Sequence, residues 1–284
     1  MGARTKLPKR LAGCLALLLT LALPACGEQE VVNDAGVQGG NLFYGRNAEF
    51  SIGVSRLREG LQVQVSGCSA TEGPQAVSPT ELRYSCRLTT TGAVNFTVSD
   101  AQGASVYTRT FAVPEPRVVL DTSRGEIELE LQPRSAPLTV DNFLAYVAAD
   151  FYTNLIFHRV VPGFVVQAGG FESGMTPRAP PLPPVVLESN RGLLNVRGSL
   201  AMARTNAPDS ATSQFFINLV DNPFLDFRPA ATDRPETPGY AVFGSVVRGI
   251  EVVDAIATIP TASVAGFSNV PTDDVLIRSA RRIR

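Results

Sequence analysis

The residues best suited to chemistry in this 284-residue chain lie in five short blocks of its C-terminal half. One block joins the only histidine of the chain, His158, to a cation, Arg159, and the others supply carboxamides, aromatic rings and small residues. A cation and amide groups beside apolar rings favour catalysis by electrostatic stabilisation in an apolar pocket. The blocks are Phe157–Gly170, Arg197–Arg204, Ser213–Asn218, Asn222–Asp226 and Gly239–Gly244.

These five blocks, in this order, resemble the cyclophilin family of peptidyl-prolyl cis–trans isomerases, in particular its exported bacterial members. The resemblance runs from about Pro116 to Arg284. It implies a mainly β fold, an eight-stranded antiparallel barrel capped by two helices. It also implies an enzyme that rotates X-Pro bonds in unfolded or flexible polypeptides, with no cofactor and no metal.

Such an enzyme must lower a rotational barrier of about 18–20 kcal/mol, which exists because the amide bond is conjugated. To turn an uncatalysed flip of tens of seconds into one of milliseconds requires about 10⁴-fold, or about 5.5 kcal/mol. No bond is made or broken, so the reaction needs neither a nucleophile nor a proton shuttle. A cation or donor near the prolyl nitrogen and an apolar pocket for the ring are sufficient.

The resemblance assigns the catalytic role to Arg159, with Gln167 and Phe164 beside it. A hydrogen bond to a charged group contributes about 1.5–3 kcal/mol, so Arg159 alone falls short of the total. Holding the ring in a partly dry cleft must supply the rest. The residues that would line the substrate groove are His158, Val165, Ala203, Arg204, Gln214, Phe216, Phe224, Leu225 and Tyr240.

Each of these residues also has a purely structural interpretation. Arg159 alone could be a solvated strand residue, and the phenylalanines are core residues by default. Phe215, next to Phe216 on a strand, should point to the opposite face and into the core. His158 is not expected to act as a base, because the reaction has no proton to abstract. We expect it to lie at the edge of the groove or to pack.

Three positions depart from the pattern of the best-known eukaryotic members. Phe224 stands where many have Trp, which argues against tight cyclosporin binding because an indole donor is missing. Tyr240 takes the place of a pocket His and Val165 that of a Met, and both keep the wall apolar. The polar, proline-rich segment Phe227–Pro238 is expected to lie next to the pocket.

Strands and helices must position these residues. Two strands are predicted at Val118–Thr122 and Glu126–Leu131, joined by a turn at Ser123-Arg124-Gly125. A helix opened by Thr139, whose hydroxyl would cap its first turn, carries an apolar stripe that starts at Val140. A second helix is predicted at Ile250–Ala257.

The N-terminus predicts export. Residues 1–25 join several cations to the apolar stretch 11–23, which is too short to span about 30 Å of hydrocarbon and is typical of a signal peptide. Leu23-Pro24-Ala25-Cys26 resembles the lipobox of bacterial lipoproteins, in which the cysteine is acylated; an ordinary secretory signal is the alternative. Gly27 is not the acidic residue that retains some lipoproteins at the inner membrane. We therefore predict a lipid-anchored protein of the bacterial envelope, on the periplasmic or surface side, with the outer membrane favoured.

Two further regions precede the isomerase domain, which is expected at 115–284. Residues 26–40 are polar and glycine-rich, which predicts a flexible tether. Residues 41–114 alternate apolar and polar positions in short runs, which predicts a small, immunoglobulin-like β-sandwich. Cys68 and Cys86 are expected to pair in an exported domain. Two thiolates with the only histidine elsewhere make a poor metal site, so no metal is expected there.

The composition supports a globular protein, with 44% hydrophobic and 18% charged residues. Because residues 26–284 hold 21 cations against 26 anions, nucleic acid is not an expected partner. We expect a monomer that meets the membrane through a lipid at Cys26. Two alternatives to the enzyme stay open: a scaffold that binds proline-containing peptides with little turnover, and a structural lipoprotein that acts through its sandwich. The presence of Arg159, Phe164, Gln167 and Phe216 together favours the enzyme.

Overall fold

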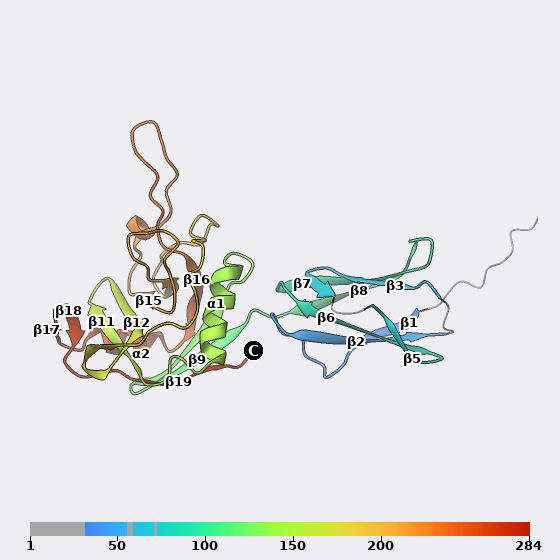
Figure 1. Ribbon diagram of the computed structural model, residues 1–284, viewed down its shortest axis with the longest axis horizontal. Helices are drawn as coiled ribbons and strands as arrows, with labels where there is room; N and C mark the ends of the chain where they lie inside the picture. The colour runs from blue at the N-terminus through green and yellow to red at the C-terminus, as the bar shows by residue number, and fades with distance from the viewer. Residues whose placement is uncertain (1–31, 56–58, 71–72) are drawn as a thin grey trace, which may run out of the picture.

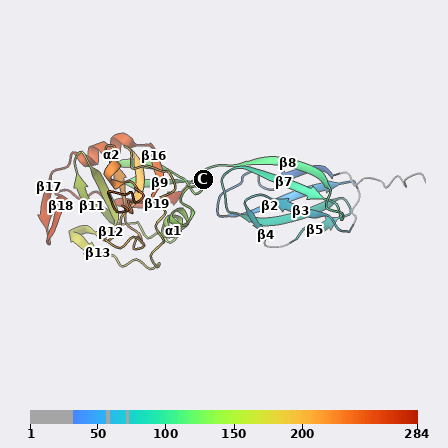
Figure 2. The ribbon, with the colours of Figure 1, turned by 90° about the horizontal axis from the view of Figure 1, so that it is seen from above.

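The structure is a computed structural model that describes residues 32–55, 59–70 and 73–284. The predicted signal peptide, the predicted acylation site Cys26 and the first part of the predicted tether lie outside these residues. Two units built mainly from β-strands follow one another along the long axis of the molecule. The first is a sandwich, and the second is a barrel that carries both helices (Figures 1 and 2). Within the described residues, no helix has the length and hydropathy that a membrane crossing requires.

The N-terminal unit is a sandwich of two antiparallel sheets. One sheet contains β1 (Val32–Val37), β2 (Asn47–Val54), β6 (Glu81–Leu88) and β4 (Cys68–Ala70) in that order, with β5 (Gln75–Ser78) also paired to β6. The other contains β3 (Gln62–Val65), β7 (Gly92–Ser99) and β8 (Ser105–Val113).

Alternation of side chains along each strand explains how the two sheets pack. In β2, the apolar side chains at every second position from Ala48 to Val54 are buried. The ring of Phe50 lies 5.1 Å from that of Phe96 and 5.5 Å from that of Phe111, both on the opposite sheet. Cys68 and Cys86 form the expected disulfide, with their Cα atoms 5.7 Å apart, and it joins β4 to β6. The pairing prediction is confirmed.

The prediction of a flexible tether is wrong for Val32–Val37, which form β1 on the edge of the larger sheet. Both Val32 and Ala35 are buried although they stand three positions apart. A β-bulge between Val32 and Asp34 shifts the register, so both side chains point inward. The bulge hides the period of two that marks a strand in the sequence.

The C-terminal unit is a nearly closed antiparallel barrel, as the resemblance implied. Its eight strands run in the order β11 (Leu155–Val161), β12 (Val165–Glu172), β15 (Phe215–Asn218), β14 (Ser199–Met202), β16 (Val242–Arg248), β10 (Gly125–Leu131), β9 (Arg117–Thr122) and β19 (Ile277–Arg282). The gap between the first and last strands is bridged by backbone hydrogen bonds from Asn154 N to Ile277 O at 2.8 Å and from Phe157 N to Val275 O at 2.9 Å. Smaller elements are attached to the barrel. The strand β13 (Thr176–Pro177) pairs with β12, and β17 (Thr261–Val264) and β18 (Phe267–Pro271) form a separate hairpin. Two 3₁₀ turns are η1 (Ser173–Met175) and η2 (Pro223–Leu225).

Two helices, α1 (Pro137–Ala148) and α2 (Ile250–Ala257), cover the barrel. The prediction for α2 is confirmed, but the predicted N-cap of α1 is wrong. The helix begins at Pro137, and the hydroxyl of Thr139 donates to the buried carboxylate of Glu188 at 2.8 Å. That carboxylate also accepts the backbone N–H of Thr139 at 2.9 Å, so a residue from a distant loop satisfies the helix start.

Candidate active site

A cavity of about 230 Å³ opens on the barrel where β11, β12, β14 and β15 lie side by side. Every residue that lines it was singled out in the sequence. They are Arg159, Phe164, Val165, Gln167, Ala203, Arg204, Phe216, Leu225 and Tyr240. Segments up to 81 positions apart in the chain therefore meet around one cavity.

Arg159 supplies the positive charge of this cavity. It lies on β11 opposite Gln167 of β12, and its guanidinium carbon is 5.8 Å from the centre of the Phe164 ring. No carboxylate among the described residues forms an ion pair with Arg159, and its side chain donates no hydrogen bond to them. The guanidinium is half-buried, and its donors are free to meet a ligand.

The apolar wall of the cavity is a small cluster separate from the main core. Val165, Phe216 and Leu225 are each at least nine-tenths buried and pack together with Ala201. The ring of Tyr240 meets Phe216 edge-on, with their centres 5.6 Å apart. Edge-to-face packing holds both rings in one orientation, so the wall has a defined shape.

Arg204 braces the rim of the cavity. Its Nε and Nη2 atoms both donate to the carbonyl of Gly239, at 3.0 and 2.9 Å, and its Cζ lies 4.6 Å from the centre of the Tyr240 ring. Arg204 therefore contacts the neighbouring wall of the cavity as well as the substrate groove, where the resemblance placed it. It holds the Tyr240 ring through a cation–π contact.

Gln214 does not line the cavity, contrary to the prediction that it lines the groove, and instead orients Gln167. The Nε2 of Gln167 donates to the Oε1 of Gln214 at 3.0 Å. The Gln214 side chain lies across Gly170, where a Cβ would be only 2.5 Å from its amide. A glycine is required at this point because any larger residue would displace the amide that positions Gln167.

His158 does not reach the groove, contrary to the expectation that it lies at the groove edge. Its side chain is buried, and its ring centre is 4.7 Å from that of Phe171. Burial, followed by the positive charge of Arg159, lowers the pKa of His158 to about 4. The imidazole is therefore neutral at pH 7 and packs beneath the site, which is the structural interpretation of this residue.

Phe224 also lies outside the cavity lining. It is 56% exposed, and its ring stacks on Phe164 with the two centres 5.5 Å apart. It thus extends the apolar surface around the pocket mouth. Phe215, by contrast, is fully buried against Phe143 and Tyr152, which confirms its assignment to the core.

A buried network of asparagines behind the site was not assigned from the sequence. Asn222 donates to the carbonyl of Phe164 at 3.2 Å and to Asn218 Oδ1 at 2.8 Å, and Asn218 donates to Asn195 Oδ1 at 3.2 Å. Asn195 in turn donates to the carbonyl of Leu225 at 3.1 Å. The network joins the two walls of the cavity. Its signal in the sequence is weak: Asn218 is a polar residue inside the otherwise apolar run Phe215–Val220.

The loop Phe227–Pro238 begins and ends at the cavity, as predicted. The backbone N–H of Tyr240 donates to the carbonyl of Leu225 at 2.9 Å and closes the base of the loop. Bridges between Arg228 and Thr237 and between Ala231 and Arg234 hold its two arms together. In Figure 1 this orange loop projects farther from the barrel than the other loops around it.

Comparisons with known proteins assign the barrel to one family. The family model "Cyclophilin type peptidyl-prolyl cis-trans isomerase/CLD" matches residues 117–282. Over 173 residues the chain is 49% identical to peptidyl-prolyl cis-trans isomerase A of Dickeya dadantii, which covers 61% of this chain and 87% of that protein. It is 48% identical over 162 residues to peptidyl-prolyl cis-trans isomerase B of Escherichia coli, covering 57% of this chain and 96% of that protein.

A solved structure is also similar. The crystal structure of a cyclophilin-type isomerase of Cryptosporidium parvum, determined in the presence of the dipeptide Ala-Pro, is 28% identical with a TM-score of 0.48. The similarity covers 58% of this chain and 96% of that chain.

Proposed function

The chain belongs to the cyclophilin-type peptidyl-prolyl cis–trans isomerase family, and on that premise we propose that it isomerises X-Pro bonds in exported proteins as they fold. The isomerase activity is that of its relatives. The further elements of the proposal are the exported clients, the lipid anchor at Cys26 and the envelope location.

One observation carries the catalytic part of the proposal. The free guanidinium of Arg159 lines a cavity that has one apolar wall and is large enough for a proline ring. In that arrangement the ring packs against Phe216 and Leu225 while the cation faces the prolyl nitrogen.

The geometry accounts for the rate enhancement without any covalent step. As the amide twists, its nitrogen becomes pyramidal and its lone pair becomes available to accept a hydrogen bond from Arg159. That bond forms only in the twisted state, so it lowers the barrier and leaves ground-state binding unchanged. It contributes about 1.5–3 kcal/mol. The carboxamide of Gln167, held by Gln214, supplies a second pre-oriented polar group.

Two features support the envelope location. The apolar stretch and lipobox-like sequence before Cys26 are typical of a bacterial lipoprotein. The Cys68–Cys86 disulfide suits a compartment outside the reducing cytosol. In this proposal the sandwich, with its immunoglobulin-like pattern of short strands, is a spacer or docking module between the membrane and the barrel.

An assay of a short X-Pro peptide tests the catalytic part of the proposal. The full chain should accelerate the cis-to-trans flip of the peptide by orders of magnitude over the uncatalysed rate. A protein that binds the peptide but leaves the flip rate unchanged would be the scaffold, not the enzyme.

Fractionation of bacterial cells tests the anchor. The full chain should be found with the membranes, and Cys26→Ser should move it to the soluble fraction, because acylation needs the thiol. Recovery of both forms in the soluble fraction would show an ordinary secretory signal instead. That outcome would leave the isomerase activity intact.

A further inference from the structure

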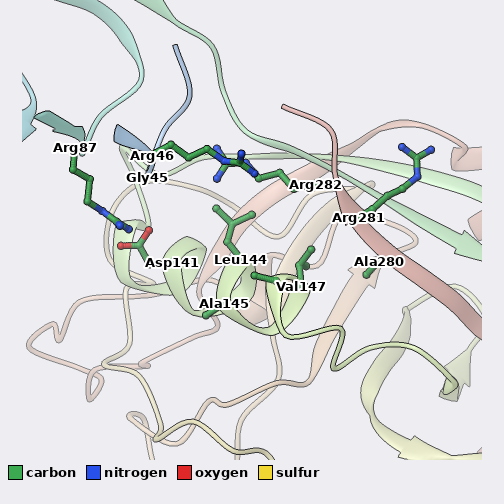
Figure 3. A pocket seen from close by; sticks show the side chains of 11 residues that line it. Gly45, Arg46, Arg87, Asp141, Leu144, Ala145, Val147, Ala280, Arg281 and Arg282 are labelled. Carbon is green, nitrogen blue, oxygen red and sulfur yellow. The ribbon is translucent and has the colours of Figure 1, made fainter. Parts of the chain in front are cut away.

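The junction of the two units contains a second and larger cleft, of about 570 Å³. Figure 3 shows it between the sandwich and the outer side of α1. Its sandwich side is formed by Gly45 and Arg46, just before β2, and by Arg87 of β6. Its barrel side is formed by Asp141, Leu144, Ala145, Val147 and Ala148 of α1 and by Ala280, Arg281 and Arg282 of β19.

The units meet through specific hydrogen bonds beside this cleft. The hydroxyl of Tyr44 donates to Asp141 at 2.9 Å, and Arg282 Nη2 donates to the carbonyl of Tyr44 at 2.6 Å. Tyr44 itself is buried. These contacts hold the sandwich against the barrel, so the walls of the cleft have a defined separation.

The charge of the cleft is strongly unbalanced. Four arginines line the cleft together with one carboxylate, Asp141, which already accepts the hydroxyl of Tyr44. Arg281 pairs with Glu126 at 3.5 Å, outside the cleft. Within the part of the chain that the structure describes, neither Arg46 nor Arg87 pairs with any carboxylate.

Arg46 of the sandwich lies close to Arg282 of the barrel, so two positive charges from different units are neighbours. In Figure 3, Arg46 and Arg282 lie side by side above Leu144, and Arg87 points toward Asp141. Burial lowers the pKa of Arg282, and the positive charge of Arg46 lowers it further. The same two arginines also line a neighbouring hollow of about 180 Å³. An anion bound beside Arg46 would reduce the repulsion between these two cations.

We propose that this cleft binds a phosphate-bearing anion, with Arg46 and Arg87 as its principal ligands. Guanidinium groups match the oxygens of a phosphate in a bidentate fashion, and a phosphate monoester carries between one and two negative charges at neutral pH. The side chains of Leu144, Ala145, Val147 and Ala148 form an apolar floor, which suits a phosphate attached to an apolar body. The volume of the cleft lies within the usual range for small-ligand sites.

The site depends on the additional domain of this chain. Gly45, Arg46 and Arg87 lie outside residues 117–282, the part that matches the isomerase family. A bound phosphate would bridge the sandwich to the barrel. The ligand would therefore be recognised by the pair of domains and not by the barrel alone.

Calorimetric titration of the full chain with phenyl phosphate at constant ionic strength tests the proposal. Saturable binding is expected, and phenyl phosphate should bind more tightly than inorganic phosphate because its ring covers the apolar floor. Arg46→Gln and Arg87→Gln should each weaken binding by about tenfold, the effect of losing one charged hydrogen bond. Both side chains are exposed, so these variants should fold.

Arg83→Gln is the matched control. Arg83 lies on the same strand as Arg87, is similarly exposed, and pairs with Glu49 and Glu81 outside the cleft. Its substitution makes the same change in net charge and should leave binding unchanged. If all three variants lose affinity equally, binding is non-specific attraction to net charge and the proposed site is wrong.

Vesicles distinguish a free phosphate from a lipid headgroup. Sedimentation with phosphatidylglycerol vesicles, lost in Arg46→Gln and Arg87→Gln but kept in Arg83→Gln, would assign the phosphate to a lipid. Binding of phenyl phosphate without vesicle binding would assign it to a soluble ester. If neither probe binds in a manner that depends on Arg46 and Arg87, the proposal is overturned, and the isomerase assay is unaffected by that result.

Discussion

The sandwich and the barrel are built from the same kind of strand, yet they bury different side chains. Among the described residues, Thr91 is the one buried polar side chain of the sandwich, and its hydroxyl has no hydrogen-bond partner. The barrel buries many, among them Glu188, Asn195, Asn218 and Asn222, nearly all within hydrogen-bonded networks.

This difference follows from what each unit must do. A sheet that only packs against another sheet needs an apolar face and nothing more. The barrel must hold a cavity open, and buried amides fix the backbone on both sides of that cavity. Burying a polar group costs free energy unless it is hydrogen-bonded, so such networks are retained where a shape has to be maintained.

The disulfide should give the largest effect, and only in the sandwich. The disulfide closes a loop of about 17 residues and stabilises the sandwich by about 3 kcal/mol. Replacing Cys68 and Cys86 by alanine removes this cross-link. Denaturant unfolding of the full chain should show an earlier sandwich transition, with isomerase activity at 25 °C unchanged. Loss of activity in a folded variant would show that the disulfide of the sandwich also affects the active site of the barrel.

Arg159→Ala should reduce kcat/KM by about 10- to 150-fold, because it removes a charged hydrogen bond formed in the transition state. Circular dichroism should show an intact fold. Arg109→Ala is the matched control, since Arg109 lies 5.1 Å from the Phe111 ring, much as Arg159 lies near Phe164, but on the sandwich. Equal activity of Arg159→Ala and the parent would remove Arg159 from the mechanism.

The only histidine of the chain should make the barrel sensitive to acid. The pKa of His158 is lowered from 6.5 to about 4 by burial, so between these values the unfolded state binds more protons than the folded state. The free energy of unfolding of the barrel therefore does not depend on His158 protonation above pH 6.5. As the pH falls below 6.5 it decreases, by about 2 kcal/mol at pH 5. Urea unfolding at both pH values measures this loss. His158→Gln should lower the pH dependence of the barrel, and an unchanged slope would show that carboxylates alone cause it.

Asn222→Ala should give a smaller effect, a loss of about 1–2 kcal/mol of barrel stability together with a higher KM. It leaves the carbonyl of Phe164 and the amide oxygen of Asn218 without this donor, so one wall of the cavity loosens. In the sandwich, Thr91→Val removes a buried hydroxyl that has no partner and should leave stability equal or slightly higher. Comparable losses of stability in Asn222→Ala and Thr91→Val would show that buried polar side chains stabilise both units in the same way.

The sequence predicted the barrel, its two helices and every residue that lines the proline-sized cavity. The helices follow from local periodicity. The barrel and the cavity lining were implied by the resemblance of five short motifs to a known family, and such motifs are visible in one dimension. The residues that it misplaced are those whose neighbours come from elsewhere. His158 follows Phe157 in a motif that points to the site, yet the pairing of β11 turns its ring inward against Phe171.

The amino-acid sequence by itself determined which chemistry is available: the cation of Arg159, the carboxamide of Gln167 and the apolar rings of the neighbouring motifs. Tertiary structure alone decided how α1 is capped, by Glu188 some 49 positions away from Thr139, and how Tyr44 meets Asp141 across 97 positions. It also formed the basic cleft between the two units. Contacts of this kind depend on how complete surfaces fit together, and no local pattern of residues records that fit.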